Sequence, residues 1–230
     1  MLEIYKKTQK ESLCIYDCEI GNYKDILSQQ HDLVEQRHKN KIPNTVLTAE
    51  HFPVITLGVR EKCNEILMNQ KELENRNIDI VKTHRGGSVT AHNPGQLVFY
   101  PIINLKDFNL GISEYIRKLE QIGIELLSQL GINAARKKGF PGLWVGQKKI
   151  AFIGVRVSKS VTYHGMAINI QNDLSIFDYI VACGLEGVEI TSVLKESGTK
   201  NSMRDIKEKL CKLLIKYFSK DKQIVYEYCA

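Results

Sequence analysis

Apolar residues recur at intervals of three and four positions in three segments of the chain, which is the spacing of one face of an α-helix. The three predicted helices span residues 23–37, 113–130 and 202–218. Ser113 is expected to cap the second helix, because a serine hydroxyl accepts hydrogen bonds from the first backbone amides. Each segment has one apolar side, so we expect each helix to bury that side against a core.

Shorter apolar runs between these helices are typical of buried β-strands. They lie at 45–48, 53–57, 78–82, 97–103, 143–145, 149–157, 161–170 and 224–228. Short polar turns separate the runs from 143 to 170, which predicts an antiparallel meander. We expect Glu50, His51 and Phe52 at the bend between the first two strands. The last run is expected to be a short edge strand.

These elements follow one another without a linker, an internal repeat or a low-complexity stretch. A chain of 230 residues with 43% hydrophobic and 25% charged residues can bury its own core. We therefore predict that residues 1–230 form a single α/β (α+β) domain. A run of about 18 apolar residues, which a membrane helix needs, is absent from the sequence. The polar start, with Glu3 and Glu11, argues against a targeting peptide, so we expect a cytoplasmic protein.

The net charge of +6 favours an acidic partner. The basic residues form small clusters without interleaved aromatics, unlike the denser stripe that is typical of nucleic-acid binding. These clusters contain Lys6, Lys7, Lys10, Arg136, Lys137, Lys138, Lys148 and Lys149. We therefore expect electrostatic steering of an acidic protein and no nucleic-acid partner.

The six cysteines show no zinc-binding pattern. They stand at positions 14, 18, 63, 183, 211 and 229, without a Cys-x-x-Cys pair or a Cys/His grouping of the usual spacing. We expect free thiols and no metal site. Cys211 is expected on the inner face of the last helix.

Residues 85–101 contain the densest set of groups that can bind a ligand (Arg-Gly-Gly-Ser-Val-Thr-Ala-His-Asn-Pro-Gly-Gln-Leu-Val-Phe-Tyr-Pro). Glycines allow the backbone to approach a ligand closely and expose amide groups to it, and Arg85 adds a fixed charge. A plain turn between two strands would explain the paired glycines alone. The added hydroxyls and histidine favour a pocket for a small molecule or an acyl group.

Cys183 and Lys149 are candidates for reactive groups. A cysteine in an apolar segment such as Ile-Val-Ala-Cys-Gly-Leu is usually a small core residue, and a lysine at a strand end is usually solvated. If Lys149 pointed inward beside Cys183, its charge would favour the reactive thiolate. Their spacing in the sequence does not show that they meet.

Three histidines have weaker signals. His92 and His164 each follow a Thr-x-His pattern beside glycines, whereas His51 stands in Glu-His-Phe-Pro and is expected to be structural. A lone histidine is more often a structural hydrogen-bonding group than a catalyst.

Several strings of the sequence, in order, resemble the lipoyl(octanoyl) transferase family of the biotin/lipoate protein ligase superfamily. They occur at 50–58 (Glu-His-Phe-Pro-Val-Ile-Thr-Leu-Gly), 85–92, 94–101, 143–145 (Leu-Trp-Val), 149–156 (Lys-Ile-Ala-Phe-Ile-Gly-Val-Arg), 164–165 with Asn169, and 183–184. The resemblance covers roughly residues 20–195. One departure is Ala182, where the family usually has proline; a proline would fix the backbone dihedral before the cysteine, so its absence is expected to loosen this loop.

The resemblance implies a single octanoyltransferase domain with a mixed, largely antiparallel sheet flanked by helices. It implies transfer of octanoyl from acyl carrier protein to a lysine of lipoyl domains, without a cofactor. These acceptors would be the E2 subunits of 2-oxoacid dehydrogenases and the glycine cleavage H protein. We expect a monomer. A thiolate suits this chemistry because it exchanges readily with a thioester.

The resemblance also assigns residues to roles. Cys183 matches the acyl-thioester nucleophile and Lys149 its partner lysine. Substrate binding is assigned to Arg85, Gly86, Gly87, Ser88, Val89, Thr90, Ala91, His92, Phe152, Ile153, Gly154, Gly165, Met166 and Ala167. Of these, Val89, Phe152, Ile153 and Met166 are candidates to line the acyl tunnel, although each also fits a plain core residue.

Three alternative functions remain open from the sequence. An ATP-dependent lipoate or biotin ligase on the same fold would make an acyl-adenylate and need no cysteine nucleophile. A cysteine-dependent amidotransferase would move the acyl group between lipoyl-domain proteins. A non-catalytic module that binds an acyl chain or a carrier protein would leave Cys183 in the core.

Overall fold

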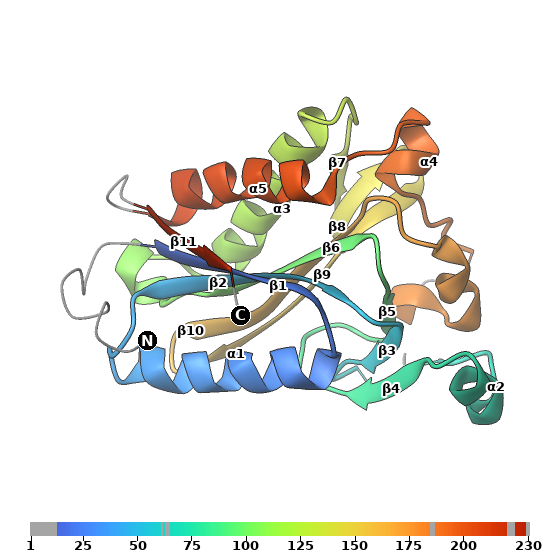
Figure 1. The fold of residues 1–230 in the computed structure, drawn as a ribbon, viewed down its shortest axis with the longest axis horizontal. Coiled ribbons are helices and arrows are strands. Elements are labelled where there is room, and N and C mark those ends of the chain that lie inside the picture. The colour runs from blue at the N-terminus through green and yellow to red at the C-terminus, as the bar shows by residue number, and fades with distance from the viewer. Residues whose placement is uncertain (1–12, 61, 63–64, 185–186, 220–223, 229–230) are drawn as a thin grey trace.

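A mixed eight-stranded sheet forms the centre of the protein (Figure 1). The computed structural model describes residues 13–60, 62, 65–184, 187–219 and 224–228. The strands follow the order β11-β1-β2-β6-β10-β9-β8-β7. Their bounds are β1 (Leu13–Gly21), β2 (Asn44–His51), β6 (Gln96–Ile102), β7 (Ala135–Lys137), β8 (Phe140–Val145), β9 (Lys148–Ser158), β10 (Val161–Asn169) and β11 (Ile224–Tyr228). β1 is parallel to β11 and β2, and the other pairings are antiparallel, which confirms the predicted mixed, largely antiparallel sheet.

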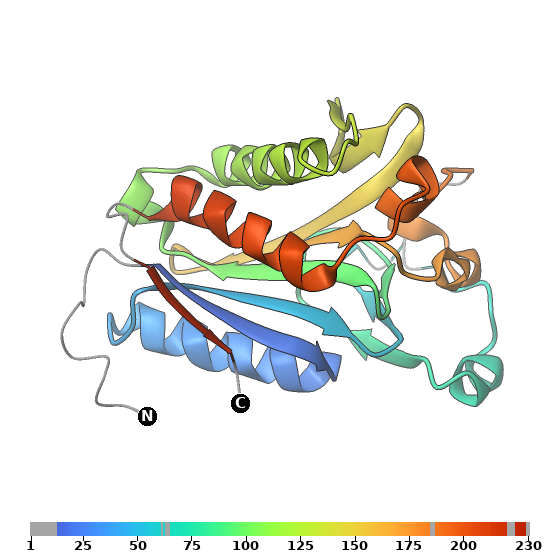
Figure 2. The same ribbon diagram turned by 45° about the horizontal axis from the view of Figure 1, so that its top comes forward.

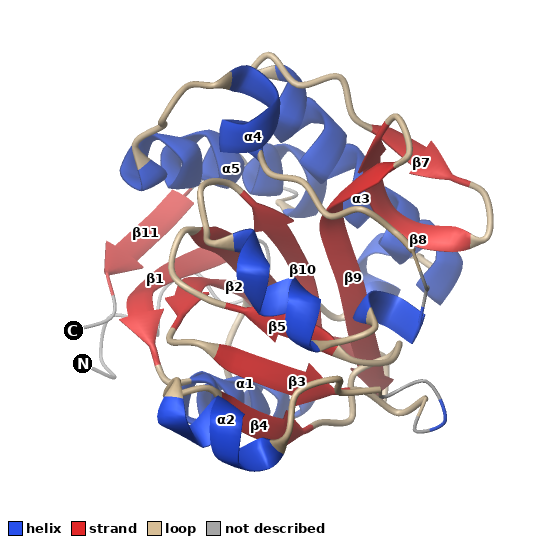
Figure 3. Cartoon of the chain, turned by 90° about the vertical axis from the view of Figure 1, so that its right-hand side faces the viewer, coloured by secondary structure: helices blue, strands red, loops and turns tan. Residues whose placement is uncertain are grey.

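A second, three-stranded sheet stands beside one end of the large one (Figure 3). It consists of β3 (Val54–Leu57), β4 (Asp79–Lys82) and β5 (Thr90–His92). β3 is parallel to β4 and antiparallel to β5. The segment between β4 and β5 crosses to the large sheet, where the Gly86 N–H donates to the Val155 carbonyl over 3.0 Å. The small sheet therefore holds this glycine-containing loop against β9.

Helices cover both faces of the large sheet (Figures 1 and 2). α1 (Tyr23–His38) lies on one face, and α3 (Ile112–Ser128) and α5 (Met203–Phe218) lie side by side on the other. The main core joins α3 and α5 to the sheet through buried residues such as Tyr115, Leu119, Leu210 and Phe99. Shorter helices complete the fold: α2 (Gln70–Asn75), α4 (Val193–Ser197) and the 3₁₀ turns η3 (Leu105–Phe108), η4 (Leu174–Tyr179) and η5 (Ala182–Gly184).

The three long helices and the eight strands predicted from the sequence are present, with small shifts at their ends. The predicted Ser113 cap is wrong. α3 begins at Ile112 with Gly111 as its N-cap, and the Glu114 carboxylate accepts from the Gly111 N–H over 2.8 Å. Ser113 therefore lies inside the first turn, where its hydroxyl cannot cap that turn.

The predicted bend after the first strand is also displaced. Glu50 and His51 continue β2 and pair with Ile20 and Gly21 of β1, and the chain turns only at Phe52. A register irregularity in β1 between Asp17 and Ile20 lets this pairing extend to the end of β2. The strands β1, β5 and β7 and the separation of two sheets were not predicted.

Some expectations fall outside the described residues. These concern Glu3, Lys6, Lys7, Lys10, Glu11, Cys63 and Cys229. Cys211 packs in the main core from α5, as predicted. In the part of the chain that the structure describes, every helix is too short or too polar to span a bilayer.

Candidate active site

Lys149 and Cys183, which are far apart in the sequence, meet in the structure. The Lys149 Nζ lies 3.4 Å from the Cys183 Sγ and donates to it. Lys149 is 3% exposed, so its ammonium is withdrawn from bulk water, whereas Cys183 is partly exposed and is a free thiol. A cation at this distance favours the thiolate, which is the nucleophilic form.

Lys149 is directed inward by its position at the start of β9. Its N–H donates to the Glu189 carbonyl over 2.8 Å, and its carbonyl accepts from the Thr191 N–H over 2.9 Å. Gly142 on the neighbouring strand leaves room for the side chain, because a Cβ there would lie 3.1 Å from the Lys149 Cε and 2.3 Å from the Ala151 oxygen. The site therefore requires glycine at position 142.

The surroundings of the Lys149 ammonium hold a cation without neutralising it. The Pro141 carbonyl accepts from Nζ over 3.1 Å, and the rings of Trp144 and Phe152 lie 5.2 and 5.3 Å from it. Aromatic faces attract a cation at such distances. Among the described residues, Lys149 forms no ion pair with a carboxylate. The positive charge of Lys149 can therefore stabilise a thiolate at Cys183.

Cys183 occupies the middle of η5 in the left-handed region, with φ 60° and ψ 14°. A non-glycine residue adopts this conformation mainly where surrounding contacts hold it. Here the Cys183 N–H donates to the Val89 carbonyl and the Val181 N–H to the Glu65 carbonyl, each over 3.0 Å. Ala182 packs in a buried apolar cluster. Backbone hydrogen bonds and packing thus hold the turn around Cys183.

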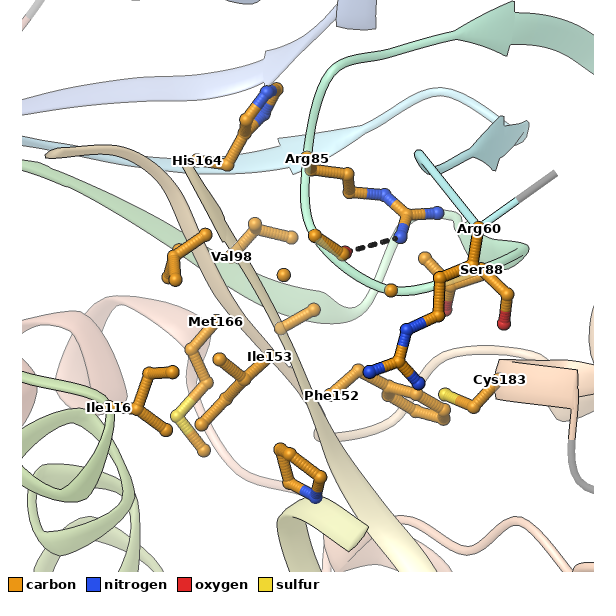
Figure 4. A pocket seen from close by; sticks show the side chains of 18 of the residues that line it. Arg60, Arg85, Ser88, Val98, Ile116, Phe152, Ile153, His164, Met166 and Cys183 are labelled. Atoms are coloured by element: carbon orange, nitrogen blue, oxygen red, sulfur yellow. Dashed lines mark hydrogen bonds between the residues drawn. The ribbon is translucent and has the colours of Figure 1, made fainter. Parts of the chain in front are cut away.

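A cavity of about 400 Å³ opens beside these two residues (Figure 4). Its size falls within the range of small-molecule sites. The predicted binding residues found in its lining are Arg85, Gly86, Gly87, Ser88, Thr90, His92, Phe152, Ile153, Gly154, Gly165, Met166 and Ala167. Figure 4 shows Ile153, Met166 and Val98 gathered in one part of the cavity, with Phe152 beside Cys183.

Val89 and Ala91 do not line this cavity. Both side chains are fully buried in the apolar cluster that also contains Phe177 and Ile180. Alternate residues of an extended segment face opposite sides, so Ser88 and Thr90 line the cavity and their neighbours face away from it. Val89 is therefore not among the lining residues of this cavity. Its carbonyl instead fixes the Cys183 backbone.

The cavity has further lining residues that the sequence did not single out for binding. They are Tyr23, Arg60, Val98, Tyr100, Ile112, Ile116, Gly139, Phe140, Pro141 and Val155, together with His164. Ile112 and Ile116 stand one turn apart on α3, and Val98 and Tyr100 share one side of β6. These spacings are equally typical of core residues, so only the tertiary arrangement identifies them.

Arg85 braces the glycine-containing loop rather than facing solvent. Its guanidinium donates to the Thr56 carbonyl over 2.6 Å and to the Thr56 hydroxyl over 2.8 Å. Burial lowers the pKa of the Arg85 guanidinium, and the nearby Tyr23 and Cys183 oppose this shift. Glycine at position 154 allows the loop to lie close to β9, since a Cβ there would lie 2.9 Å from the Gly86 oxygen.

All three candidate histidines are buried and neutral near pH 7. Burial lowers the pKa of His51 to about 4 and that of His164 to about 3, and it holds the pKa of His92 well below its usual value. The His51 Nδ1 bonds to the Gly21 carbonyl over 3.3 Å and its Nε2 to the Tyr100 hydroxyl over 2.6 Å. His51 is thus a structural residue in this geometry, as predicted.

The functional groups that surround the cavity suit an acyl group. In the described residues no cluster of three or more His, Cys, Asp or Glu side chains is placed to hold a metal ion. The cavity wall combines apolar side chains with backbone segments rich in glycine, and a thiol beside an ammonium stands at the cavity. Such an arrangement can accept an acyl chain and attack its carbonyl carbon with sulfur.

Known proteins share both the fold and much of the sequence. A lipoate-protein ligase A bound with ATP superposes with a TM-score of 0.71 at 14% identity, covering 94% of this chain and 89% of that one. A biotin protein ligase from Aquifex aeolicus, in complex with biotin and ATP, gives a TM-score of 0.54 at 17% identity, with 90% and 70% covered. These likenesses show that the fold is that of the lipoate and biotin protein ligases.

The sequence comparisons are more specific. The lipoyl protein ligase A/B catalytic domain matches residues 22–215. The octanoyltransferase of Dictyoglomus turgidum is 40% identical over 206 residues, 90% of this chain and 87% of that protein. A mitochondrial octanoyltransferase of Arabidopsis thaliana is 40% identical over 202 residues, 87% and 86% of the two chains. The chain therefore belongs to the lipoyl protein ligase A/B catalytic domain family and, within it, to the octanoyltransferases. It is an acyltransferase.

Proposed function

We propose that this chain transfers an octanoyl group from acyl carrier protein, through a thioester on Cys183, to a specific lysine of lipoyl domains. Those of 2-oxoacid dehydrogenase E2 subunits and the glycine cleavage H protein are the proposed acceptors. The observation that carries the proposal is the 3.4 Å contact between the Lys149 Nζ and the Cys183 Sγ beside an apolar cavity.

In the first step the Cys183 thiolate attacks the carbonyl carbon of the octanoyl thioester. The new C–S bond forms as the carrier's C–S bond breaks, and the carrier leaves as a thiolate. Lys149 stands close enough to the reacting sulfur to give this thiolate a proton. The products are the acyl-enzyme, a carrier thiol and a neutral Lys149, so atoms and charges balance.

In the second step the amine of the acceptor lysine attacks the acyl-enzyme carbonyl. An amide bond forms, the Cys183 thiolate leaves, and neutral Lys149 takes the proton that the amine loses. Lys149 thereby returns to its charged state and again stabilises the thiolate. The cationic and the proton-accepting roles of Lys149 belong to successive steps, so they do not conflict. A thioester-to-amide conversion is downhill and needs no ATP.

The tetrahedral intermediate of each step needs a donor for its oxyanion. The Cys183 N–H is already engaged with the Val89 carbonyl, so it does not supply one. The Gly86 N–H is likewise engaged, with the Val155 carbonyl. The remaining donors are the backbone amides of Gly87 and Ser88, which line the cavity, and, in the first step, the Lys149 ammonium. We assign the oxyanion to them.

We propose that the chain acts as a monomer. Acyl carrier proteins and lipoyl domains tend to be acidic, and the net charge of +6 is complementary to both. Of the basic clusters, Arg136 pairs with Glu120 and Lys148 with Glu196, while Lys138 remains exposed. Arg60, outside these clusters, is also exposed. We propose that the exposed cations steer the protein substrates to the site in the cytoplasm.

The test is acyl transfer from octanoyl-acyl carrier protein to a lipoyl domain in the absence of ATP. We expect amide formation at the same rate with and without ATP. A strict requirement for ATP would establish the ligase alternative instead. Faster transfer from an octanoylated lipoyl domain than from the carrier protein would establish an amidotransferase, and no transfer would leave a binding module.

A further inference from the structure

A chain of buried hydrogen bonds connects the cavity wall to the strand that carries Lys149, and Asn169 stands at its centre. Asn169, Gln96 and Thr191 are each 0% exposed. The Asn169 Nδ2 donates to the Thr191 carbonyl over 3.0 Å, and its Oδ1 accepts from the Gln96 Nε2 over 2.8 Å. Beyond Gln96, the Gln96 Oε1 lies 2.6 Å from the His92 Nδ1.

The Thr191 carbonyl at one end of this series of hydrogen bonds determines the direction of every bond in it. A carbonyl only accepts, so Asn169 must present its amide nitrogen to Thr191 and its oxygen to Gln96. Gln96 must then present its nitrogen to Asn169 and its oxygen to His92. His92 must therefore carry its proton on Nδ1, which leaves Nε2 as an acceptor. The Thr191 carbonyl thus determines the tautomer of a cavity-lining histidine.

At Thr191, the series of hydrogen bonds connects to Lys149 through backbone hydrogen bonds. The Thr191 N–H donates to the Lys149 carbonyl over 2.9 Å, and the Lys149 N–H donates to the Glu189 carbonyl over 2.8 Å. Residues 189–191 therefore form the backbone partner of Lys149 on the side away from β8. Among the described residues, their only strand pairing is an isolated parallel bridge between Ile190 and Lys149. Within the described residues, the Asn169 amide is the buried side-chain donor that anchors them to the large sheet.

We propose that Asn169 is a positioning residue: its side chain holds residues 189–191 in place so that the Lys149 ammonium stays beside Cys183, and it fixes the tautomer of His92 in the cavity wall. The inference rests on the proposed function in treating Lys149 and Cys183 as the reacting pair. Asn169 does not touch the reacting atoms, and it acts through Thr191 and Gln96. Loss of its amide would allow the ammonium to move away from the sulfur.

The test compares Asn169→Ala with Asn172→Ala. Asn172 is the matched control, because it donates to the same Asn169 oxygen over 3.3 Å and to Asn93 over 3.0 Å but has no bond to residues 189–191. The first measurement is the rate at which iodoacetamide alkylates Cys183 at neutral pH. This reaction reports the thiolate and needs no octanoyl donor. The second measurement is the rate of octanoyl-enzyme formation.

We expect Asn169→Ala to lower the alkylation rate toward that of Lys149→Ala and to slow octanoyl-enzyme formation by up to about 100-fold, as a displacement of about 1 Å at a reacting group can. Asn172→Ala should leave the alkylation rate within about twofold of the wild type, as expected where no reacting group moves. An unchanged alkylation rate in folded Asn169→Ala, or an equal loss in both variants, overturns the inference. If Asn169→Ala does not fold, Asn169→Ser carries the same expectations. A wild-type enzyme that alkylates readily but forms no octanoyl adduct would refute the proposed function and leave this result intact.

Discussion

The Lys149 Nζ lies 3.4 Å from the Cys183 Sγ, although 34 positions separate the two residues and they belong to different elements. The β8–β9 hairpin carries Lys149 and the 3₁₀ turn after η4 carries Cys183. Residues 189–191 return from that turn and pair with the Lys149 backbone. Residues 189–191 thus hold the Lys149 backbone, whereas the Val89 carbonyl holds that of Cys183.

Removal of the Lys149 charge should make Cys183 less reactive. In Lys149→Ala we expect the alkylation of Cys183 at neutral pH to slow about tenfold or more, because an adjacent cation stabilises the thiolate. The measurement is the initial rate of alkylation by iodoacetamide at neutral pH. Lys148→Ala is the control, since Lys148 pairs with Glu196 instead of the thiol. An unchanged alkylation rate in Lys149→Ala contradicts the proposed pairing of Lys149 with Cys183.

The cavity should set the length of the acyl chain. Ile153→Trp adds bulk to the cavity wall and should shift preference from octanoyl toward hexanoyl, whereas Ile153→Val should not. Each methylene that loses its apolar surroundings costs about 0.8 kcal/mol, or roughly fourfold in specificity. The ratio of kcat/KM for octanoyl and hexanoyl donors measures this change. An unaltered ratio in Ile153→Trp would place the acyl chain elsewhere.

The buried histidines should make the fold less stable in mild acid. His51 and His164 titrate at about 4 and about 3 in the native state, because burial lowers each pKa, and near 6.5 when unfolded. Below pH 6.5 the unfolded state binds more protons, so the free energy of unfolding falls as the pH falls toward the native values. The loss is about 1.4 kcal/mol per pH unit for each histidine.

Urea denaturation at pH 7.5 and pH 5.5 measures this dependence. The difference in unfolding free energy between the two pH values should be smaller in His164→Gln than in the wild type. Glutamine does not titrate, so it removes one of the contributing groups. An identical difference in both proteins would mean that His164 is protonated to the same extent in the native and unfolded states.

Exposed cations should contribute to recognition of both protein substrates. Arg60→Glu and Lys138→Glu should raise the KM for acyl carrier protein and for the lipoyl domain, and added salt should raise both KM values in the wild type. Lys212→Glu makes the same charge change on the exposed side of α5 and should have little effect. Salt-independent KM values would rule out electrostatic steering.

The sequence predicted the helices and most strands because their apolar spacings are regular. It missed β1, whose burial changes along its length from fully buried Leu13 to exposed Glu19 and Ile20. The second sheet was missed for another reason. Its strand β5 lies in the segment at residues 85–101 that the sequence analysis interpreted as a ligand-binding loop, so the sequence offered no third strand for β3 and β4.

The site could be predicted only in part. Cys183 and Lys149 were found through a resemblance, because a spacing of 34 residues has no geometric meaning without the fold. The sequence did not show that Val89 packs in the apolar cluster and not in the cavity wall, because the alternation of residues 88–91 depends on the pairing of β5 in the small sheet. Ile112 and Ile116 reach the cavity from α3 by tertiary packing, and no local pattern distinguishes them from core residues.

Intact-mass analysis after mixing with octanoyl-acyl carrier protein tests the central claim most directly. We expect the wild-type chain to gain one octanoyl group, and we expect the adduct to be absent from Cys183→Ala and lost from the wild type when a lipoyl domain is added. An adduct that persists in Cys183→Ala, or a wild-type chain that gains no mass, would contradict the assignment of Cys183 as the acyl carrier.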